Sequence, residues 1–564
     1  MIFLKRILFL SILFACLTTH ASAKVLNGIK TFTQSGVTIK VKSRFSQIQI
    51  GGLCPIIVEI DNDTKKQHTW DISFKSSYNW NYEPSFSKID TMTVGPGKKK
   101  TFEFSVPIIN GDRGSYSKML LEIEVRGYGI EHQSIREHFN YNSDIRPTLI
   151  SDQLRNIKNK LQANTSGSGH GNTPLCSFNQ RDLGSNWMDY TGFASVWITS
   201  LEWKSLSADV TNGLKKWVAL GGNLFITFDG KNKIKAHGLG MIEWVNISNV
   251  NKSIQPITNK IKFVKANPLA LSKINNWTSD LLTAIKPIES KPFLFSLLTA
   301  IIGIVIGPIN LFLYCRKKRM KIVFTTPLIA VLTSLVLLVF IVFQDGIGGS
   351  GFRSTLVVTL PEDHLTIKMQ DQVSTSGLVI GSSFDVPEKT IVTPLQLNHL
   401  KNNFHTNNYT NWKNSFSGDW FNSRSQQGQK LQSVTPSRSK IDIQIETKQD
   451  KKTIHALSSI DDTLNDFYYI DHQDQIWYTK KIRTGEKIIL EKVESAEYKK
   501  WMKSVSKKFD QPTKALLSNI DFRKGYYFST STTDKAAIPN YSSFNWKQVL
   551  TLYTGPTLLS EVSK

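Results

Sequence analysis

The chain has 564 residues, of which 40% are hydrophobic and 20% are charged. This length predicts roughly two to four domains, and this composition excludes an intrinsically disordered protein. The formal net charge is +24, but the lysines are scattered. A nucleic-acid site concentrates basic residues on one element, so no nucleic-acid partner is predicted. No His or Cys cluster has metal-ligand spacing, and neither a metal nor a cofactor is predicted.

The N-terminus has the three parts of a secretory signal peptide. Lys5 and Arg6 precede an apolar run over residues 7–17, and a small-x-small cleavage site ends at Ala23. Lipoprotein processing at Cys16 is the alternative, because a loose lipobox precedes that residue. We favour cleavage after Ala23, which makes residues 1–23 a signal peptide and the remainder an exported protein.

Residues 24–145 are predicted to form a β-sandwich. Apolar and polar residues alternate over residues 37–41 and 102–106, which is the period of a half-buried strand. Turns rich in Gly, Asn and Asp separate these runs, and short strands at this spacing are typical of a sandwich.

Residues 146–290 are predicted to form an α/β domain. A buried-strand run at 194–199 precedes an amphipathic helix at 207–220, and Gly221-Gly222 separates that helix from a second buried strand at 223–228. A strand, a helix and a strand in this order form a β-α-β unit, which predicts an open parallel sheet.

This unit resembles part of the class I glutamine-amidotransferase-like domains. Trp217-Val218, Gly221-Gly222 and the strand at 224–228 match a repeated pattern of strand, short acidic turn, helix ending in Trp-Val-x-x-Gly-Gly, and strand. Catalytic members carry a Cys on the sharp turn after one of these strands, with His and Glu partners. Here the turn after Phe228 is Asp229-Gly230. The resemblance therefore implies a catalytically degenerate domain, and no catalytic residue is assigned.

The α/β domain offers one candidate ligand site. Ligands of open α/β sheets bind beyond the carboxyl ends of the strands, where Asp229, Glu202 and His170 could meet. The site would hold a small molecule of unknown identity, and the alternative is a vestigial crevice without a ligand.

Two uncharged apolar runs, residues 293–314 and 322–343, are predicted to be transmembrane helices. Each is long enough to cross a hydrocarbon core of about 30 Å. The loop between them, residues 315–321, holds five basic residues: Arg316, Lys317, Lys318, Arg319 and Lys321. The positive-inside rule assigns this loop to the cytoplasm. Together with the signal peptide, it predicts a two-helix hairpin in the lipid bilayer of the bacterial cytoplasmic (inner) membrane, with both soluble regions extracytoplasmic.

The hairpin carries a second resemblance. Gly307, Pro308 and Asn310, followed by a basic turn and then by Pro327 in the next apolar run, resemble a family of uncharacterised bacterial two-helix membrane proteins. Their large extracytoplasmic region has a similar layout, and the family has no assigned activity. With no ionisable residue inside either run, the hairpin is interpreted as an anchor and not as a transport path.

Residues 344–564 are predicted to form an extracytoplasmic, mainly-β domain. Residues 402–432, which are rich in Asn, Ser and Gln, are expected to be a long loop. Its aromatic residues Trp412, Trp420 and Phe421 would anchor the loop, stack on sugars or pack on a partner. Residues 494–508 are predicted to be an exposed helix, and residues 509–564 are expected to be irregular.

The four cysteines do not form a disulfide framework. Cys16 lies in the predicted signal and Cys315 at a predicted membrane edge. Cys54 and Cys176 remain, either as one bridge in an oxidising compartment or as two separate thiols.

The sequence favours a non-catalytic, membrane-anchored envelope protein that presents extracytoplasmic modules for assembly with other envelope proteins. The alternative is an envelope hydrolase or a ligand-binding protein that uses the α/β crevice near Asp229.

Overall fold

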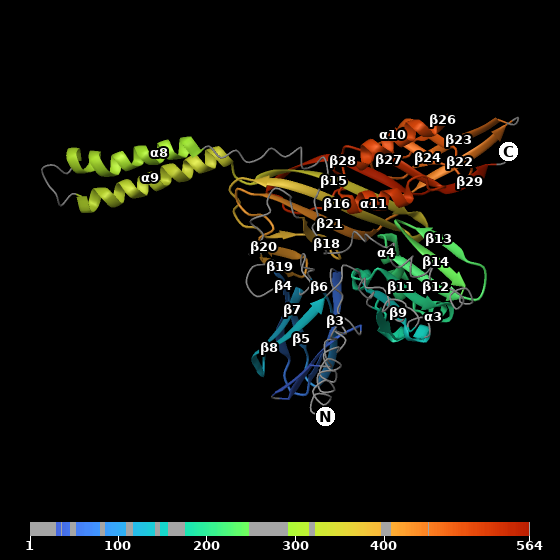
Figure 1. The fold of residues 1–564 in the computed structure, drawn as a ribbon, viewed down its shortest axis with the longest axis horizontal. Helices are drawn as coiled ribbons and strands as arrows, with labels where there is room; N and C mark the ends of the chain where they lie inside the picture. Colours follow the sequence, from blue (N-terminus) through green and yellow to red (C-terminus); the bar gives the residue numbers. More distant parts are fainter. Residues whose placement is uncertain are drawn as a thin grey trace, which may run out of the picture. The chain divides into compact units, whose positions relative to one another are not determined.

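The computed structural model describes residues 30–34, 36–45, 52–78, 85–108, 117–141, 147–155, 159, 175–246, 292–314, 322–395, 408–448 and 451–562. The predicted signal peptide and basic loop lie outside these residues. The chain forms two compact units. The N-terminal unit comprises Met1–Lys273 with Asn403–Lys413, and the C-terminal unit comprises Ile274–Asn402 with Asn414–Lys564. Strands dominate both units (Figure 1), which confirms the predicted β-rich, multidomain class.

The N-terminal unit begins with a four-stranded antiparallel sheet in the order β1-β2-β3-β6. Its strands are β1 (Lys30–Gln34), β2 (Val37–Ser43), β3 (Gly52–Asn62) and β6 (Lys98–Ile108). The alternating pattern in β2 has the expected effect, because Val37, Ile39 and Val41 are fully buried and the residues between them are partly exposed.

A second sheet packs on the first. Its strands in this unit follow the order β19-β5-β4-β7-β8 and are β4 (His68–Tyr78), β5 (Ser85–Val94), β7 (Ser117–Gly127), β8 (Ile130–Tyr141) and β19 (Asn408–Trp412). The rings of Phe74 in β4 and Phe104 in β6 lie 5.3 Å apart. Ser76 Oγ also donates a hydrogen bond to the Pro107 carbonyl. The two sheets therefore meet face to face, as in a β-sandwich.

Strand β19 comes from a part of the sequence far from its neighbours. It pairs in parallel with β5, from Asn408 opposite Ser85 to Trp412 opposite Ile89. The Tyr409 ring stacks on Phe86 with the ring centroids 4.9 Å apart. The prediction of a long loop over residues 402–432 is therefore wrong from residue 408 on. Strands β20 (Ser415–Gly418) and β21 (Gln426–Pro436) follow β19.

The rest of the N-terminal unit is an α/β sheet with the strand order β10-β9-β11-β12-β14-β13. All neighbours are parallel except β13, which is antiparallel to β14. The strands are β9 (Thr148–Ser151), β10 (Leu175–Phe178), β11 (Ser195–Thr199), β12 (Asn223–Phe228), β13 (Lys233–His237) and β14 (Gly240–Asn246). The parallel pairing of β11 with β12 is the one that the β-α-β pattern predicts.

Helices α3 (Ser200–Ser205) and α4 (Ala208–Ala219) connect β11 to β12. Short 3₁₀ helices, Asp152–Leu154, Gln180–Asp182 and Trp187–Tyr190, follow or precede strands of this sheet. In α4, Leu214, Trp217 and Val218 are fully buried, as the amphipathic pattern indicates. Gly240 permits close packing at the helix end, because a Cβ there would lie 2.2 Å from the Val218 carbonyl oxygen.

The C-terminal unit is built on a twelve-stranded sheet in the order β18-β21-β16-β15-β28-β27-β24-β25-β26-β23-β22-β29. Besides β21, its strands are β15 (Gly349–Leu360), β16 (Leu365–Ser376), β18 (Ile391–Leu395), β22 (Ile441–Lys448), β23 (Lys451–Ser458), β24 (Leu464–Ile470), β25 (Ile476–Ile482), β26 (Lys487–Val493), β27 (Tyr526–Ser531), β28 (Phe544–Pro556) and β29 (Leu558–Val562). A short strand β17 (Phe384–Asp385) pairs with β20.

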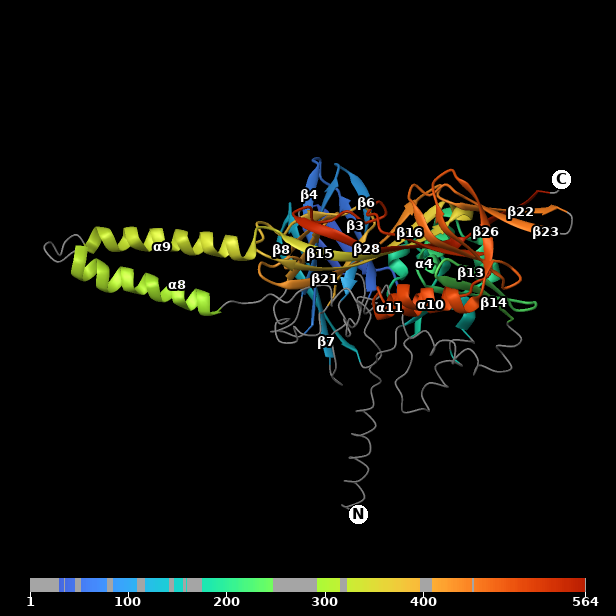
Figure 2. The same ribbon diagram turned by 90° about the horizontal axis from the view of Figure 1, so that it is seen from above.

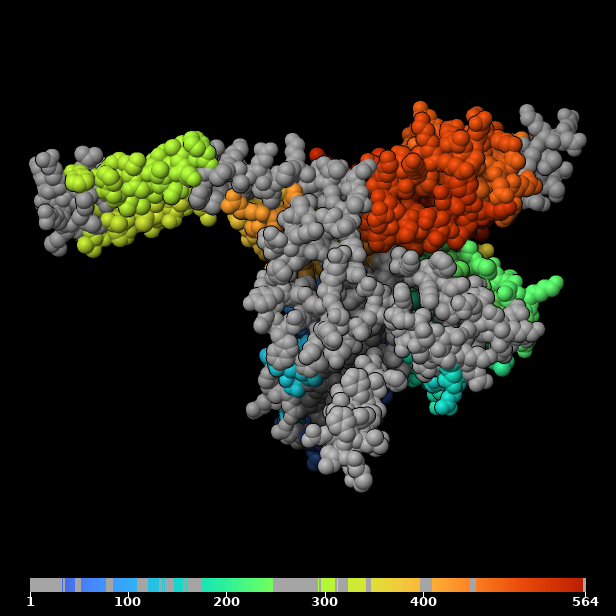
Figure 3. All heavy atoms as spheres, viewed as in Figure 1, coloured from blue at the N-terminus to red at the C-terminus, as the bar shows by residue number. Residues whose placement is uncertain are grey.

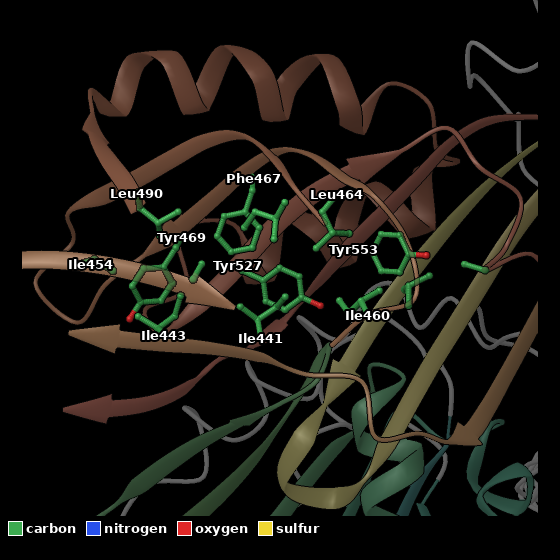
Figure 4. Packing of buried hydrophobic residues seen from close by; sticks show 14 residues of the cluster. Ile441, Ile443, Ile454, Ile460, Leu464, Phe467, Tyr469, Leu490, Tyr527 and Tyr553 are labelled. Atoms are coloured by element: carbon green, nitrogen blue, oxygen red, sulfur yellow. The ribbon is translucent and has the colours of Figure 1, made fainter. Parts of the chain in front are cut away.

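The sheet curls around one apolar core. Ile441 and Ile443 of β22 share this core with Tyr469 of β24 and Tyr527 of β27 (Figure 4). Near the middle of the sheet, β28 pairs with β15 on one side and with β27 on the other. The expectation that residues 509–564 are irregular is therefore wrong, because these strands are specified by partners distant in sequence.

Two helices accompany this sheet, α10 (Ser495–Ser506) and α11 (Gln511–Ile520). The helix predicted at 494–508 is present as α10, although one face of it is buried. Tyr498 lies with its ring centroid 5.4 Å from Tyr468 of β24 and 5.7 Å from Phe528 of β27. The 3₁₀ turn Pro361–Asp363 joins β15 to β16.

Three helical segments occupy the predicted membrane runs: α8 (Pro292–Ile304), the π-helix η4 (Val305–Tyr314) and α9 (Ile322–Asp345). The α8–η4 segment lies beside α9 in both views (Figures 1 and 2). Pro308 lies within the π-helical part. Proline has no N–H to donate and interrupts the α-helical hydrogen bonds, and the π-helical turns lie at this interruption.

The helix α9 is long and apolar enough to cross a membrane by its length and composition. Its segment Val323–Phe340 has a mean hydropathy of 2.4, and none of this segment is buried. Among the described residues it is the one helix of this kind, since the first run gives only the shorter apolar helix Ser296–Ile309. Large apolar side chains of α8 and α9, such as Phe293 and Phe324, are 78% and 77% exposed. The space-filling view shows atoms of these two helices at the surface (Figure 3).

Candidate functional site

The predicted ligand site lies at the carboxyl edge of the parallel sheet. Glu202 lies in the first turn of α3, directly after β11, and Asp229 directly follows β12. Both residues therefore follow the same edge, as the fold rule predicts. Their environments differ, because Glu202 is 2% exposed whereas Asp229 is exposed. His170 lies outside the described residues.

Both carboxylate oxygens of Glu202 accept hydrogen bonds from the protein. Ser151 Oγ, at the end of β9, donates to Oε1 at 2.5 Å. The Thr199 backbone N–H and Oγ1, at the end of β11, donate to Oε2 at 3.0 and 2.8 Å. This is a capping box at the start of α3. Glu202 thus joins the ends of two neighbouring strands to a helix, which is a structural role.

The turn that carries Asp229 is fixed to the neighbouring strand. The side-chain amide of Asn246, at the end of β14, donates to the Gly230 carbonyl oxygen at 2.5 Å. The Asn246 backbone N–H donates to Asn232 Oδ1 at 2.8 Å. In the part of the chain that the structure describes, no group of three His, Cys, Asp or Glu side chains could hold a metal ion.

Replacing Glu202 by Ala should destabilise the α/β sheet by about 2 kcal/mol, because three hydrogen bonds are lost and the Ser151 hydroxyl stays buried. Hydrogen exchange of the β9 and β11 amides measures this loss locally. Asp229→Ala is the matched control, since it removes an exposed carboxylate from the same edge, and it should leave these amides protected. Equal effects of the two substitutions would contradict the structural role of Glu202.

A buried ionic cluster joins the β-sandwich to the α/β sheet inside the N-terminal unit. Arg44 follows β2, and its Nε lies 3.8 Å from Asp189 Oδ2. Ser105 Oγ, in β6, donates to Asp189 Oδ1 at 3.1 Å. Arg44 also pairs with Glu103. Desolvation of Asp189 outweighs the nearby Arg44 charge and raises its pKa to about 6.

Apolar and backbone contacts surround this cluster. The Thr191 hydroxyl accepts a hydrogen bond from the Leu53 backbone N–H at 2.9 Å. The Phe45 ring contacts Phe193 edge to face with the ring centroids 5.3 Å apart. The cluster could not be predicted from the sequence, because a single Asp between aromatic residues does not indicate its distant Arg partner. Its role is to fasten the two folds of this unit together.

The Asp189 cluster should make stability depend on pH. Because the folded-state pKa is above the ordinary value of 3.8, the folded protein holds a proton that the unfolded chain releases between about pH 4 and 6. The contribution of this proton to the free energy of unfolding is therefore full below about pH 4 and is lost as pH rises through 6. A rise in the pKa of Asp189 from 3.8 to about 6 corresponds to about 3 kcal/mol of unfolding free energy.

Thermal unfolding of wild type and Asp189→Asn between pH 4 and 7 measures this difference. The variant should lack the part of the pH dependence that lies between pH 4 and 6. Asp229→Asn, which changes an exposed carboxylate, should keep the wild-type profile. Parallel profiles for Asp189→Asn and wild type would show that Asp189 titrates as an ordinary exposed group.

A second buried ionic cluster lies inside the C-terminal unit. Lys430 of β21 lies directly opposite Asp371 of β16 in the antiparallel ladder, and Asp510 is the N-cap of α11. Lys430 Nζ is 3.0 and 2.9 Å from the two carboxylate oxygens of Asp510 and 3.4 Å from Asp371 Oδ1. The side chains of Lys430, Asp371 and Asp510 are 4%, 2% and 7% exposed.

The two aspartates of this cluster differ in acidity. Desolvation and the Asp510 charge raise the pKa of Asp371 to about 7. Burial alone would raise the pKa of Asp510 too, but Lys430 and the Thr513 hydrogen bonds hold it below its usual value. No local pattern in the sequence indicates this cluster, because its members lie on three elements and each has ordinary polar neighbours in the chain.

Two of the three predicted loop aromatics are buried. Trp420 and Phe421 are each 2% exposed, and both contact Phe384 edge to face. They therefore anchor the segment between β20 and β21 and cannot stack on a sugar. Trp412, at the end of β19, is 55% exposed.

The two candidate cysteines lie in separate folds of the N-terminal unit. Cys54 is in β3 and Cys176 is in β10. Both are buried, and they are not joined by a disulfide. Cys54 Sγ lies 3.8 Å from Ser43 Oγ. Of the two alternatives, the structure therefore has the separate thiols.

Comparisons with models of known protein families and with curated proteins find no match. Among solved structures, the sporulation control protein Spo0M from Bacillus subtilis is 14% identical over 19% of this chain and 49% of its own length, with a TM-score of 0.15. The yeast delta-COP-I mu-homology domain, complexed with a Dsl1 peptide, is 8% identical over 38% of this chain and 98% of its own, with a TM-score of 0.21. A Bacteroides uniformis β-glucuronidase is 6% identical, covers 34% and 33% of the two chains and has a TM-score of 0.16. These likenesses are too weak to carry an argument about fold or function.

Proposed function

We propose that this chain is a membrane-anchored, non-catalytic protein of the bacterial envelope whose two soluble regions lie on the same, extracytoplasmic side and serve protein–protein assembly. The observation that carries the proposal is the pairing of β5 with β19. These strands lie before and after the apolar helices in the sequence, yet they form one parallel ladder. Ladder hydrogen bonds require direct contact, and this pairing supports a single compartment for both segments.

The helices supply the anchor. The 24 residues of α9 span about 36 Å as a helix, which exceeds a hydrocarbon core of about 30 Å. Its apolar side chains, such as Val331 at 67% and Leu335 at 56% exposure, would be unfavourable in water and favourable in lipid. A chain that leaves and re-enters one compartment must cross the membrane an even number of times. Crossing by α8–η4 and then by α9 meets this requirement.

The orientation follows from charge. Arg316, Lys317, Lys318, Arg319 and Lys321 lie between the two apolar segments, and short basic loops stay in the cytoplasm. With this loop inside, the N-terminal unit and the strands after α9 are extracytoplasmic. The N-terminal signal-like segment agrees with such an export route.

The polar groups of the described residues favour an assembly role over catalysis. The Glu202 carboxylate accepts hydrogen bonds from the ends of two strands at the start of a helix. The Asp189 cluster joins the β-sandwich to the α/β sheet. The parallel order of the α/β sheet agrees with the amidotransferase-like resemblance. Catalytic members have a Cys on the turn after one of these strands, whereas the turn after Phe228 here is Asp229-Gly230. A hydrolase or ligand site at Asp229 would have to work without Glu202.

Same-side topology predicts that a disulfide can join the two strands. In the double variant Ser87→Cys with Thr410→Cys, the substituted residues face each other in the β5–β19 register, within the Cα separation that a disulfide needs. It should form in cells, because extracytoplasmic compartments are oxidising. A protease site inserted between residues 250 and 290 then gives two fragments that stay joined until a reductant is added.

Ser87→Cys with Trp412→Cys is the matched control for register. Residue 412 pairs with Ile89 and not with Ser87, so this pair should not form a bond. If the Ser87→Cys/Thr410→Cys protein is exported and folded but its two fragments separate without a reductant, this result would contradict the same-side topology.

The assembly role predicts that Asp229→Ala leaves the protein's partners unchanged. Full-length, affinity-tagged wild type and Asp229→Ala, purified after reversible cross-linking in intact cells, should recover the same envelope proteins in equal amounts. If Asp229→Ala abolished the cellular phenotype of the protein while fold and partners stayed intact, the ligand-binding or hydrolase alternative would replace the assembly role.

A further inference from the structure

We propose that Lys430 and Asp510 are joined by an intramolecular amide bond, which the protein forms by itself with Asp371 as the proton carrier. The proposal concerns the buried ionic cluster of the C-terminal unit and does not depend on the membrane assignment. Three features of the cluster carry it: the approach of the amine to one carboxyl group, the polarisation of that group, and a second carboxylate that can move the proton.

The amine and the carboxyl group are already in contact. Lys430 Nζ lies within 3.0 Å of both oxygens of Asp510, so the Asp510 carboxyl carbon is its nearest possible electrophile. The side chains of Lys430 and Asp510 are 4% and 7% exposed, which excludes bulk water. Holding reactants at such distances converts a slow bimolecular reaction into an intramolecular one.

The two oxygens of Asp510 are not equivalent. Oδ1 accepts a hydrogen bond from the Thr513 backbone N–H at 2.8 Å, at the start of the ten-residue helix α11. Negative charge that develops on Oδ1 during attack is therefore stabilised by a backbone donor and by the helix dipole. Oδ2 contacts Lys430 at 2.9 Å and is the oxygen that can leave. The hydrogen bond from the Thr513 backbone N–H to Oδ1, which caps α11, is retained in the amide product.

Asp371 is in position to move the proton. Its Oδ1 lies 3.4 Å from Lys430 Nζ and accepts no well-aligned hydrogen bond from the residues that the structure describes. Its Oδ2 accepts a hydrogen bond from the Asp510 backbone N–H at 3.2 Å. One carboxylate thus faces both the amine and the residue that carries the electrophile. The raised pKa of Asp371 suits a group that takes up and releases a proton near neutral pH.

The reaction balances without an outside reagent. Asp371 passes a proton from the Lys430 ammonium group to Asp510 Oδ2, which leaves a neutral amine beside a protonated carboxyl group. The amine attacks the Asp510 carboxyl carbon and a nitrogen–carbon bond forms. A second proton moves from this nitrogen through Asp371 to Oδ2, and the carbon–Oδ2 bond breaks with release of water. Ammonium and carboxylate become an amide and one water molecule, and Asp371 returns to its starting state. Replacing a buried ion pair by a neutral amide also removes the desolvation cost of two charges.

The bond would tie β21, the strand next to the edge strand β18, to the helix α11. Lys430 and Asp510 are 80 residues apart in sequence, and the bond would close this segment into a covalent loop that contains β22 to β26 and α10. Such a cross-link restricts the unfolded chain in the way that a disulfide does, but it is not reversed by reduction.

Mass spectrometry of the full-length protein, purified in detergent, tests the proposal. Wild type should be lighter by one water molecule than the mass calculated for the chain that remains after signal-peptide cleavage. Trypsin should not cleave after Lys430, and residues 425–438 should be recovered joined to residues 509–514 as one branched peptide. The partly exposed pair of Lys440 and Asp442 is an internal control. It has a similar nitrogen–oxygen distance of 2.9 Å, but its side chains are 42% and 22% exposed, so trypsin should cleave after Lys440.

Two variants make the test specific. Asp371→Asn keeps the shape of the side chain but cannot carry the proton, so the folded variant should have its full mass. Asp510→Asn should lose ammonia in place of water and reach the same final mass as wild type. A folded wild-type protein of full mass that is cleaved after Lys430, or a branch that runs to Asp371, would overturn the proposal.

Discussion

The parallel ladder between β5 and β19 is the contact on which the organisation of the chain depends. It consists of backbone hydrogen bonds between segments more than three hundred residues apart. The Ser85 hydroxyl adds a side-chain hydrogen bond to Asn408 Oδ1. Backbone groups in a sheet must find partners, and this pairing satisfies those of β5 with a strand from beyond the apolar helices. Both the division of the chain into units and the proposed topology follow from it.

Burial determines what the polar residues of this protein can do. Glu202, Asp189 and Asp371 are all nearly inaccessible to solvent, yet their surroundings differ. Glu202 is saturated by neutral donors, Asp189 shares one Arg with Glu103, and Asp371 competes with Asp510 for one Lys. The first two arrangements hold elements together. The third leaves one oxygen without a well-aligned donor, which is why reactivity is proposed there and not at the sheet edge.

Local patterns in the sequence predicted local structure well. The alternation at residues 37–41, the β-α-β pattern at 194–228 and the amphipathic stripe of α4 all depend on contacts that recur within a few residues. The failures at residues 408–432 and 509–562 share a physical cause. Strands there are specified by distant partners, such as β15 for β28, and polar residues such as Asn408 hide the strand signal. The ionic clusters were missed for the same reason, since only the fold brings Arg44 to Asp189.

The position of β19 in the sequence also determines the order in which the protein can mature. A ribosome has made all other strands of the N-terminal sandwich by residue 141, but β5 keeps an open edge until residues 408–412 have emerged. Unpaired edges invite pairing with other chains. During this interval the sandwich is exposed to intermolecular association, and its completion must wait until the apolar helices have been synthesised.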